Sequence, residues 1–285
     1  IYRKSQYRYY QLHKHEMYYR GQNLVKSVRK AVILSAGQGK RLLPLTQEAP
    51  KCLLPLENGM SLLGWQLTEL AKAGIDDVAV VSGFQAGKIR EEIKKYQSLL
   101  TVTEIFNPFY KMADNLGSVW AARPFMTEDF ILLNGDTLFT SPVAQRLGEA
   151  TDFPVTLTIS HKSHYDDDDM KVSTQGRELK AVGKKLPDNI VNGESIGMMK
   201  FSGSGLSWFK ESVKAAMETE EGLKTWYLAV LDKMARQGGV GTIEAGQDEW
   251  CEVDFPIDYK NACAIVESWT GQQSYKEGAD TAVAS

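Results

Sequence analysis

The chain has 285 residues, of which 43% are hydrophobic and 24% are charged, and its formal net charge is −3. These values are typical of a globular protein with a sizeable core, and they argue against a nucleic-acid partner, which would favour a basic surface. No apolar run approaches the ~20 residues that span a bilayer, and there is no secretory signal pattern. The three cysteines, Cys52, Cys251 and Cys263, lack metal-binding spacing. We therefore expect a cytoplasmic protein with reduced thiols and no transmembrane segment.

The first 29 residues differ in composition from the rest of the chain. They are rich in tyrosine, lysine and arginine, and their helical periodicity is weak. We expect residues 1–29 to form an N-terminal extension that packs on the following domain, with a basic, aromatic membrane-surface or partner segment as the alternative. The main domain is expected over residues 30–268. The small and polar residues 269–285 predict a disordered tail.

From residue 31 to about residue 150, short apolar runs alternate with amphipathic segments. Buried strands and intervening helices are predicted, in chain order, at residues 31–35, 61–74, 78–81, 88–100, 102–106 and 130–133. The second and fourth of these are the helices. This alternation is typical of βαβ units in a mostly parallel sheet.

After residue 150 the predicted strands follow one another more closely. Strands are expected at 155–159, 170–172, 179–182 and 196–201, and helices near 205–218, 222–236 and from Pro256 to about Trp269. The predicted fold class is therefore α/β. We expect a Rossmann-like, mixed but mostly parallel sheet that is flanked by helices and carries a small β-rich subregion.

A glycine-rich segment, residues 34–41 (LSAGQGKR), directly follows the first predicted strand. Its two glycines allow backbone N–H groups to approach phosphate oxygens, and Lys40 and Arg41 add positive charge. The spacing is not that of a P-loop, and Leu42 stands where a dinucleotide fingerprint has its third glycine. A simple tight turn is the alternative. Lys51 follows at short range on a proline-flanked connection, where it can neutralise a phosphoryl group.

The combined run LSAGQGKRLLPLT…PKCLLPL resembles the signature of the NTP-transferase family, which makes nucleotide sugars and related activated alcohols. The resemblance covers roughly residues 30–268. It implies a Rossmann-like domain in which a substrate phosphate attacks the α-phosphate of an NTP in line. It also implies that Arg41 and Lys51 are catalytic. The nucleotide-binding residues implied in the loop are Ser35, Ala36, Gly37, Gln38, Gly39 and Lys40.

Two aspartates are candidate Mg²⁺ ligands. Asp136 follows the predicted strand 130–133 and matches the family's metal-binding aspartate. Asp254 belongs to a late Glu-Val-Asp segment similar to that of cytidylyl and sugar-nucleotide members. Ligands of open α/β sheets bind at the carboxyl ends of strands, and Mg²⁺ prefers carboxylate oxygens. For Asp136 a turn or helix N-cap is the alternative, and for Asp254 a cap of the last helix.

Four adjacent aspartates, residues 166–169, precede a predicted strand. Such carboxylates are either solvated or held by cations. Members of the family that act on choline phosphate, inositol phosphate or phosphonates have a similar acidic turn before a strand. Within this turn we favour Asp169 and Lys171 as acceptor-binding residues, because they approach the strand that follows. The resemblance adds Lys184 for the acceptor phosphate and Glu194, in the GESIG segment, for a cationic or hydroxylated acceptor. A surface turn is the alternative for Glu194.

A further segment is a candidate for base recognition. Asn115 and Ser118 lie in a predicted loop before a short helix, and they match an N-x-x-S segment that lines the nucleotide in choline-phosphate-like members. Their donors and acceptors can read a pyrimidine edge, and helix capping is the alternative. Trp226, Tyr227 and Trp250 can supply an aromatic cage for a quaternary ammonium, although such residues more often belong to the core.

The resemblance, closest to the choline-phosphate-type cytidylyltransferases, predicts an enzyme that transfers CMP from CTP to a small phospho- or phosphono-alcohol, with Mg²⁺ as cofactor and release of pyrophosphate. One alternative is a sugar-1-phosphate nucleotidyltransferase that uses UTP, GTP, dTTP or ATP. The other is a non-catalytic nucleotide-binding regulator. The sequence leaves the acceptor, the base and the oligomeric state open.

Overall fold

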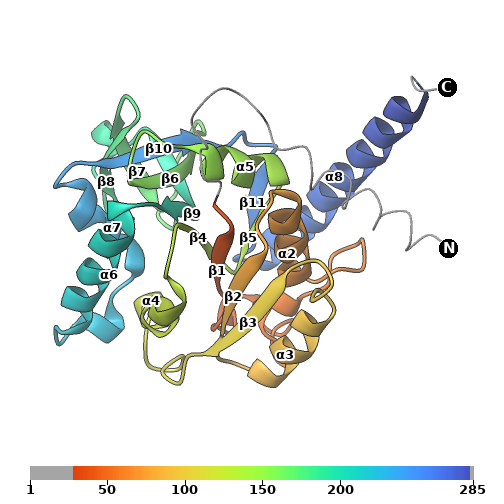
Figure 1. Ribbon diagram of the computed structural model, residues 1–285, viewed down its shortest axis with the longest axis horizontal. Coiled ribbons are helices and arrows are strands. Elements are labelled where there is room, and N and C mark those ends of the chain that lie inside the picture. The colour runs from red at the N-terminus through yellow and green to blue at the C-terminus, as the bar shows by residue number, and fades with distance from the viewer. Residues whose placement is uncertain (1–27, 283–285) are drawn as a thin grey trace.

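The computed structural model describes residues 28–282, and it describes side chains for residues 28–271. Apart from Val28 and Arg29, the predicted N-terminal extension lies outside the described residues. The centre of the molecule is one large sheet with helices on both faces (Figure 1). Its strands are β1 (Lys30–Leu34), β2 (Asp77–Ser82), β3 (Thr101–Phe106), β4 (Phe130–Asn134), β6 (Val155–Ser160), β7 (Lys171–Gln175), β8 (Glu178–Val182), β9 (Gly193–Phe201) and β10 (Val240–Glu244).

The strand order is β3-β2-β1-β4-β9-β6-β10-β8-β7, and the first four strands run parallel to one another. Following the pairings across the sheet, β8 and β9 are the strands among these nine that oppose the direction of β1. The register places Leu34 beside both Val81 and Asn134, so the carboxyl ends of three strands meet at one edge. The predicted mixed, mostly parallel sheet is confirmed.

The second half of the sheet forms the predicted β-rich subregion. β7 pairs with its neighbour β8 and also with β9, so β9, β6, β10, β8 and β7 close on themselves. A register shift between Leu157 and Ile159 interrupts the β6–β9 ladder, and such an irregularity bends a strand.

The helices cover the two faces according to the alternation of side chains along each strand. Val32, Val81 and Leu132 face a core shared with α4 (Asn115–Ala122), α6 (Ser204–Met217) and α7 (Tyr227–Ala235). Their neighbours Ile33 and Leu133 face the other core, which is shared with α2 (Leu62–Lys72), α3 (Ala86–Lys94) and α5 (Ser141–Glu149). Strands buried on both faces are apolar throughout, which is why they were predicted as continuous runs.

A third hydrophobic cluster joins the end of the chain to its beginning. It connects a two-stranded sheet, β5 (Thr137–Phe139) with β11 (Trp250–Glu252), to α2 and to α8 (Pro256–Ala282). Trp65 on α2 stacks on Trp269 with ring centroids 5.6 Å apart. We expected the last helix to end near Trp269, but α8 continues to Ala282 because no proline follows Pro256 to stop it. The domain boundary at 269 stays a prediction.

Several elements were not predicted from the sequence. These are α5, β5, β10 and β11, together with the 3₁₀ turns η1 (Lys40–Leu42), η2 (Lys51–Leu53), η3 (Arg123–Phe125), η4 (Asp188–Ile190) and η5 (Gly222–Lys224). A short helix was predicted after Ser118, but α4 already begins at Asn115, so the placement of Asn115 and Ser118 in a loop was wrong. Gly117 and Ser118 interrupt the apolar pattern in the first half of this eight-residue helix and so weaken its periodic signal.

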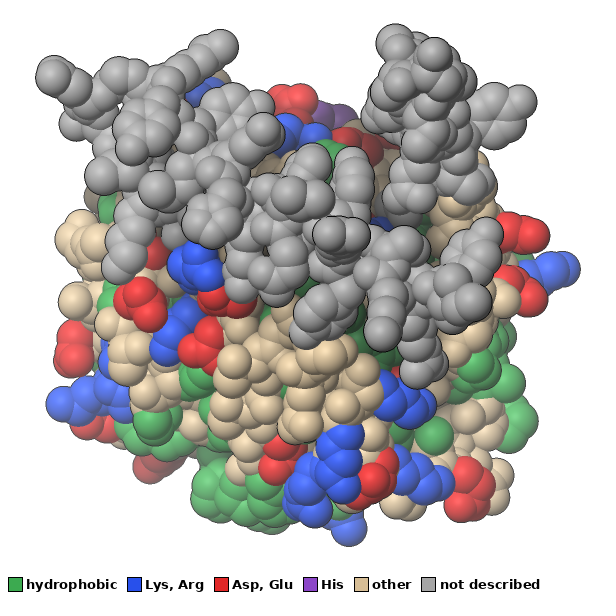
Figure 2. All heavy atoms as spheres, turned by 45° about the vertical axis from the view of Figure 1, so that its right-hand side comes forward, with side chains coloured by type: hydrophobic (Ala, Val, Ile, Leu, Met, Phe, Trp, Pro, Cys, Tyr) green, Lys and Arg blue, Asp and Glu red, His purple; other side chains and the backbone are tan. Residues whose placement is uncertain are grey.

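No helix among the described residues is long and apolar enough to cross a membrane. Figure 2 shows basic and acidic side chains interspersed over the lower part of one face, where described residues form the surface. This mixture agrees with the small net charge of −3. On the visible part of that face, the described residues present no extended basic track of the kind that binds nucleic acid.

Gln66 on α2 supports the turn between β4 and β5. It is fully buried, and its Nε2 donates to the backbone oxygens of Asn134 and Thr137, both at 2.8 Å. Replacing Gln66→Leu leaves two carbonyl groups without this donor. We expect the free energy of unfolding in urea to fall by about 1–3 kcal/mol. Gln145→Leu, which removes an exposed side chain with one 3.3 Å bond to Lys72, is the control and should change it by less than about 0.5 kcal/mol. Equal effects of the two changes would contradict this role of Gln66.

Candidate active site

A pocket of about 240 Å³ lies at the carboxyl ends of β1 and β4. This is the edge at which open α/β sheets bind their ligands. Its walls come from the glycine-rich loop, the start of η2, the start of α4 and the turn after β4. The lining residues are Leu34, Ser35, Gly37, Gly39, Lys51, Cys52, Asn115, Asn134, Gly135 and Asp136. Five other residues that were predicted to bind the nucleotide or the metal therefore line the same cavity as Lys51: Ser35, Gly37, Gly39, Asn115 and Asp136.

The glycine-rich loop is fixed to Lys51 and to Thr46. Gly39 has a left-handed backbone (φ 79°), and a Cβ there would lie 2.7 Å from Cβ of Lys51. Its carbonyl oxygen accepts a 2.7 Å hydrogen bond from Oγ1 of Thr46. Gln38 donates from Nε2 to the Thr46 oxygen at 3.1 Å and accepts from the backbone N–H of Lys51 at 3.2 Å. The loop and the catalytic candidate Lys51 therefore form one unit, and only a glycine fits at position 39.

The start of the loop is held by the segment after β2. Ser35 donates its backbone N–H to Val81 at 2.9 Å, and Ala36 accepts from Phe84 at 3.0 Å. In contrast, no atom lies within 4 Å of a Cβ built on Gly37, and the side chain of Lys40 points into an exposed region. The backbone around Gly37 is therefore open to a ligand.

Three carboxylates meet beside this loop. Asp136, Glu252 and Asp254 each offer an oxygen, and these oxygens lie within 4.8 Å of one another. The β5–β11 pairing brings them together. Glu252 lies opposite Thr137, and the backbone N–H of Val253 donates to the backbone carbonyl oxygen of Asp136 at 3.1 Å. Glu252 was not among the predicted ligands. The signal was available, because residues 252 and 254 lie on the same side of an extended segment.

Two basic side chains neutralise these carboxylates. Nζ of Lys51 lies 2.7 Å from Oδ2 of Asp136 and 2.8 Å from Oδ1 of Asp254, and Nη1 of Arg41 lies 3.0 Å from Oδ2 of Asp254. Burial alone would lower the pKa of Lys51, but the two ion pairs outweigh it and raise this pKa. Burial would raise the pKa of Asp254, but the charges of Lys51 and then Arg41 lower it.

The carboxylate set fits a divalent cation. Oδ1 of Asp136 is buried and has no hydrogen-bond partner among the described residues, so it has an unused acceptor facing the cluster. The pKa of Glu252 is raised well above its usual range, first by removal of its carboxyl group from water and then by the charges of Asp136 and Asp254, although the residue retains exposed surface. Hard cations prefer such oxygen ligands.

The acidic turn provides a second group of contacts. Oδ1 of Asp168 lies 3.2 Å from Nζ of Lys184 and 3.7 Å from Nη2 of Arg41. Nζ of Lys184 also lies 4.9 Å from the ring centroid of Trp226. Asp168 therefore links the predicted acceptor lysine to the predicted phosphate-binding arginine. Asp168 was not predicted: Asp169 was favoured for its proximity to the next strand, which does not reveal that Asp168 contacts Lys184 and Arg41.

The other predicted acceptor residues gather around Lys162, which was not predicted. Nζ of Lys162 lies 2.7 Å from Oδ2 of Asp169 and 2.9 Å from Oε2 of Glu194. Lys171, only 5% exposed, lies directly opposite Glu194 in the β7–β9 ladder. The structure thus brings Asp169, Lys171 and Glu194 to one place. Lys162 follows a strand and sits in a run without motif character, which left no sequence signal for it.

The two residues predicted to read the base differ in their placement. Asn115 lines the pocket, and its Oδ1 accepts a 2.9 Å hydrogen bond from the backbone of Tyr227. Ser118 is 4% exposed, does not line the pocket, and accepts from Nδ2 of Asn107 at 3.1 Å. The position of Ser118 gives its predicted role no support, and both roles stay predictions.

The proposed aromatic cage is not formed by its three candidates. Tyr227 is fully buried in the core, where its hydroxyl donates to Oδ1 of Asn134 at 2.8 Å. Trp250 packs against the core of the opposite sheet face. Among these three, Trp226 alone is exposed, at 39%, and its ring already contacts Lys184. The more common reading of such aromatic residues, as core, holds for Tyr227 and Trp250.

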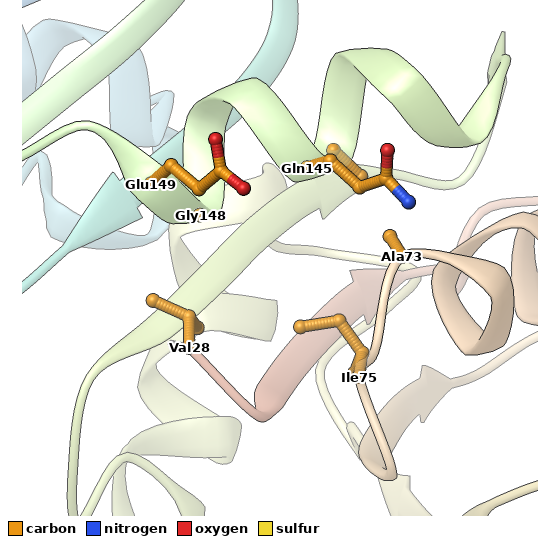
Figure 3. Close-up of a pocket in the computed structure, with 7 residues that line it drawn as sticks. Val28, Ala73, Ile75, Gln145, Gly148 and Glu149 are labelled. Atoms are coloured by element: carbon orange, nitrogen blue, oxygen red, sulfur yellow. The ribbon is translucent and has the colours of Figure 1, made fainter. Parts of the chain in front are cut away.

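A second, smaller hollow lies elsewhere in the molecule (Figure 3). It is lined by residues that include Val28, Ile75 and Gln145. Val28 precedes β1 and Ile75 precedes β2, so this hollow lies at the amino ends of the parallel strands. The three carboxylates and the glycine-rich loop lie at their carboxyl ends, which is the edge where open α/β sheets bind ligands.

Comparisons with known proteins agree with this site. A curated relative, the CTP:phosphoglutamine cytidylyltransferase of Campylobacter jejuni, is 23% identical over 254 residues, which cover 80% of this chain and 96% of the relative. The CMP-5'-(3-aminopropyl)phosphonate synthase of Streptomyces rubellomurinus is 35% identical over 121 residues, which cover 42% of this chain but 19% of that longer protein.

The fold is also found among solved structures. The CTP:phosphocholine cytidylyltransferase of Streptococcus pneumoniae superimposes with a TM-score of 0.71 at 18% identity, covering 84% of this chain and all of that one (100%). The family profile described as nucleotidyl transferase matches residues 30–168, from β1 through the acidic turn. The segment that matches the nucleotidyl transferase family therefore holds the glycine-rich loop, Lys51 and Asp136.

Proposed function

We propose that this nucleotidyltransferase is a Mg²⁺-dependent cytidylyltransferase that transfers CMP from CTP to a small phospho- or phosphono-alcohol and releases pyrophosphate. The observation that carries the proposal is the meeting of Asp136, Glu252 and Asp254 beside Lys51 and an open glycine-rich loop. Exposed backbone N–H groups and a basic pair suit a triphosphate, and the carboxylates suit its cation.

In this proposal Asp136 and Asp254, with Glu252, hold the metal. Bound there, Mg²⁺ would neutralise phosphate oxygens and fix their orientation. Lys51 stabilises negative charge at the α-phosphate, and Arg41 holds the β- and γ-phosphates of the leaving group. The ion pairs of the free protein support these roles, because Lys51 and Arg41 already contact the carboxylates. A bound cation would replace the basic groups at the carboxylates, and a bound triphosphate would replace the carboxylates at Lys51 and Arg41.

Support for CTP as the donor comes from the relatives and from Asn115. Two relatives have names that specify CTP or a CMP product. Asn115 lines the pocket, and its Oδ1 already accepts a hydrogen bond from the backbone N–H of Tyr227. Its Nδ2 is therefore the atom that can donate a hydrogen bond to a bound base. Cytosine presents an acceptor at its ring N3, whereas uracil presents an N–H there. A fixed donor therefore favours cytosine, because uracil would leave two donors facing each other.

The first prediction concerns the carboxylates. Asp254→Asn keeps the shape of the side chain but removes its charge, which weakens the metal site and leaves Lys51 with one partner. We expect kcat to fall by about 10²–10³. Asp152→Asn, at an ion pair with Arg177 in which both side chains are exposed, is the matched control and should keep wild-type turnover. A near wild-type rate of Asp254→Asn at saturating Mg²⁺ would remove the metal role from this residue.

A second prediction separates the two basic residues. Arg41→Lys preserves charge but loses the two-pronged grip of the guanidinium, so we expect kcat/KM for the NTP to fall at least about tenfold. Lys51→Ala should reduce kcat by about 10²–10³, since it removes charge stabilisation at the reacting phosphate. Pyrophosphate release under single-turnover conditions distinguishes these effects. Full activity of Lys51→Ala would contradict its assignment.

The third prediction concerns the nucleotide. With CTP, UTP, GTP, dTTP and ATP offered against phosphocholine, 2-aminoethylphosphonate and glucose-1-phosphate, we expect CTP with one of the first two acceptors to give the highest kcat/KM. A preference for UTP with the hexose phosphate would establish the sugar-nucleotide alternative. Nucleotide binding without pyrophosphate release from any pair would establish the regulatory alternative.

A further inference from the structure

Lys162, Asp169 and Glu194 form a compact charged group, the Lys162 cluster, beside the carboxylates of the active site. Lys162 follows β6, Asp169 precedes β7 and Glu194 lies on β9. One ammonium group stands between two carboxylates, with Nζ at 2.7 Å and 2.9 Å from their oxygens. The side chain of Glu194 is 9% exposed and that of Asp169 is 16% exposed, whereas Lys162 is 30% exposed. The carboxylates are therefore fixed parts of the wall, and the lysine reaches them from the more open side.

The Lys162 cluster is next to the reacting region. Asp168, the neighbour of Asp169, contacts both Lys184 and Arg41, and Arg41 contacts Asp254. The cluster therefore lies within the reach of a small molecule whose other end is at the metal carboxylates.

Lys171 gives an independent indication of a ligand. Its side chain is buried, and among the described residues its Nζ has one contact, the backbone oxygen of Lys184 at 3.5 Å. This exceeds the usual range of 2.7–3.2 Å, and no described carboxylate lies within 4.0 Å of it. A buried ammonium without a good partner is costly unless an anion completes it. Lys171 stands opposite Glu194 in the ladder, so an incomplete cation site adjoins the two carboxylates.

We propose that Asp169 and Glu194 bind a primary ammonium group of the acceptor, that Lys171 and Lys184 bind its phosphonate or phosphate, and that Lys162 occupies the ammonium position in the free protein. This inference rests on the proposed function, and it narrows the acceptor to a zwitterion with an amine at one end. Lys162 carries the same functional group as that amine, on a flexible stem that can leave.

The contact distances favour a primary amine over a trimethylammonium group. Contacts of 2.7 and 2.9 Å are N–H···O hydrogen bonds, which a quaternary nitrogen cannot donate. Quaternary groups are recognised by several aromatic faces. Among the described residues one ring faces Nζ of Lys162, that of Tyr165 at 5.8 Å, while Trp226 is engaged by Lys184. Phosphocholine is therefore expected to be a weaker acceptor than its primary-amine counterpart.

The test uses acceptors that differ only at the terminal group. With CTP and Mg²⁺, pyrophosphate release is measured for 2-aminoethylphosphonate against 2-hydroxyethylphosphonate, and for phosphoethanolamine against phosphocholine. The two amines also decide between a phosphonate and a phosphate. We expect each amine to exceed its partner about 10- to 100-fold in kcat/KM, the range of a lost charged hydrogen bond. A hydroxyl or trimethylammonium acceptor within threefold of the amine would overturn the proposal.

Two variants test the role of Lys162. Lys162→Met removes the internal competitor, so the KM for the amine should fall several-fold while that for the hydroxyl analogue stays constant. Glu194→Gln, checked for an unchanged melting temperature, should reduce the amine preference at least tenfold. Lys94→Met, at an exposed ion pair with Glu91 on α3, is the control and should change neither KM. An amine KM that is unchanged or raised in Lys162→Met contradicts the displacement.

Failure of this inference can be told apart from failure of the proposed function. If no nucleotide releases pyrophosphate with any acceptor, the proposed function is wrong. Calorimetric titration of 2-aminoethylphosphonate and 2-hydroxyethylphosphonate into the full chain, without nucleotide, still tests the ammonium site. At least tenfold tighter binding of the amine supports the site, and equal affinities reject it.

Discussion

The ion pairs of Lys51 with Asp136 and Asp254 are the interaction on which the rest of the site depends. They join three segments that are 85 and 203 residues apart in sequence. Two charges buried together are stable only when their geometry is good and further partners are present, and removal of one partner leaves the others uncompensated. Arg41 supplies such a partner to Asp254 at 3.0 Å. The site is therefore a charge network in which a metal cation can replace the basic groups at the carboxylates, while a triphosphate replaces the carboxylates at Lys51 and Arg41.

The fold holds this network from two sides. Parallel strands bring Leu34 and Asn134 side by side, which places the glycine-rich loop next to the turn that carries Asp136. The small β5–β11 sheet then carries the last part of the chain back to that turn. Stacking of Trp65 on Trp269 ties α8, and with it the β11 segment, to α2. The closed second half of the main sheet adds the proposed acceptor side, where Lys171 on β7 lies directly opposite Glu194 on β9.

Much of this arrangement could be predicted from sequence. Strands buried on both faces give continuous apolar runs, and the polar residues that follow them lie at one edge, so Asp136 and the glycine-rich loop could be placed together. The pairing that brings Asp254 to Asp136 was harder to predict, because β5 and β11 have three residues each and show no periodicity. Glu252 was missed although its spacing from Asp254 pointed to a shared side. Lys162 could not be found, since its contact with Glu194 depends on loop geometry and not on any local pattern. Ser118 was misplaced because a short helix rich in small residues resembles a loop.

We propose that the three carboxylates hold the catalytic cation between the nucleotide and Lys51. A crystal structure of the full chain with CTP and Mn²⁺ can test this, because the anomalous signal of the ion locates it. We expect one ion with oxygen ligands from Asp136, Glu252 and Asp254, the triphosphate over the backbone of Gly37, and Nζ of Lys51 turned toward the α-phosphate. An ion elsewhere, with Lys51 still bridging Asp136 and Asp254 beneath a bound nucleotide, would contradict it.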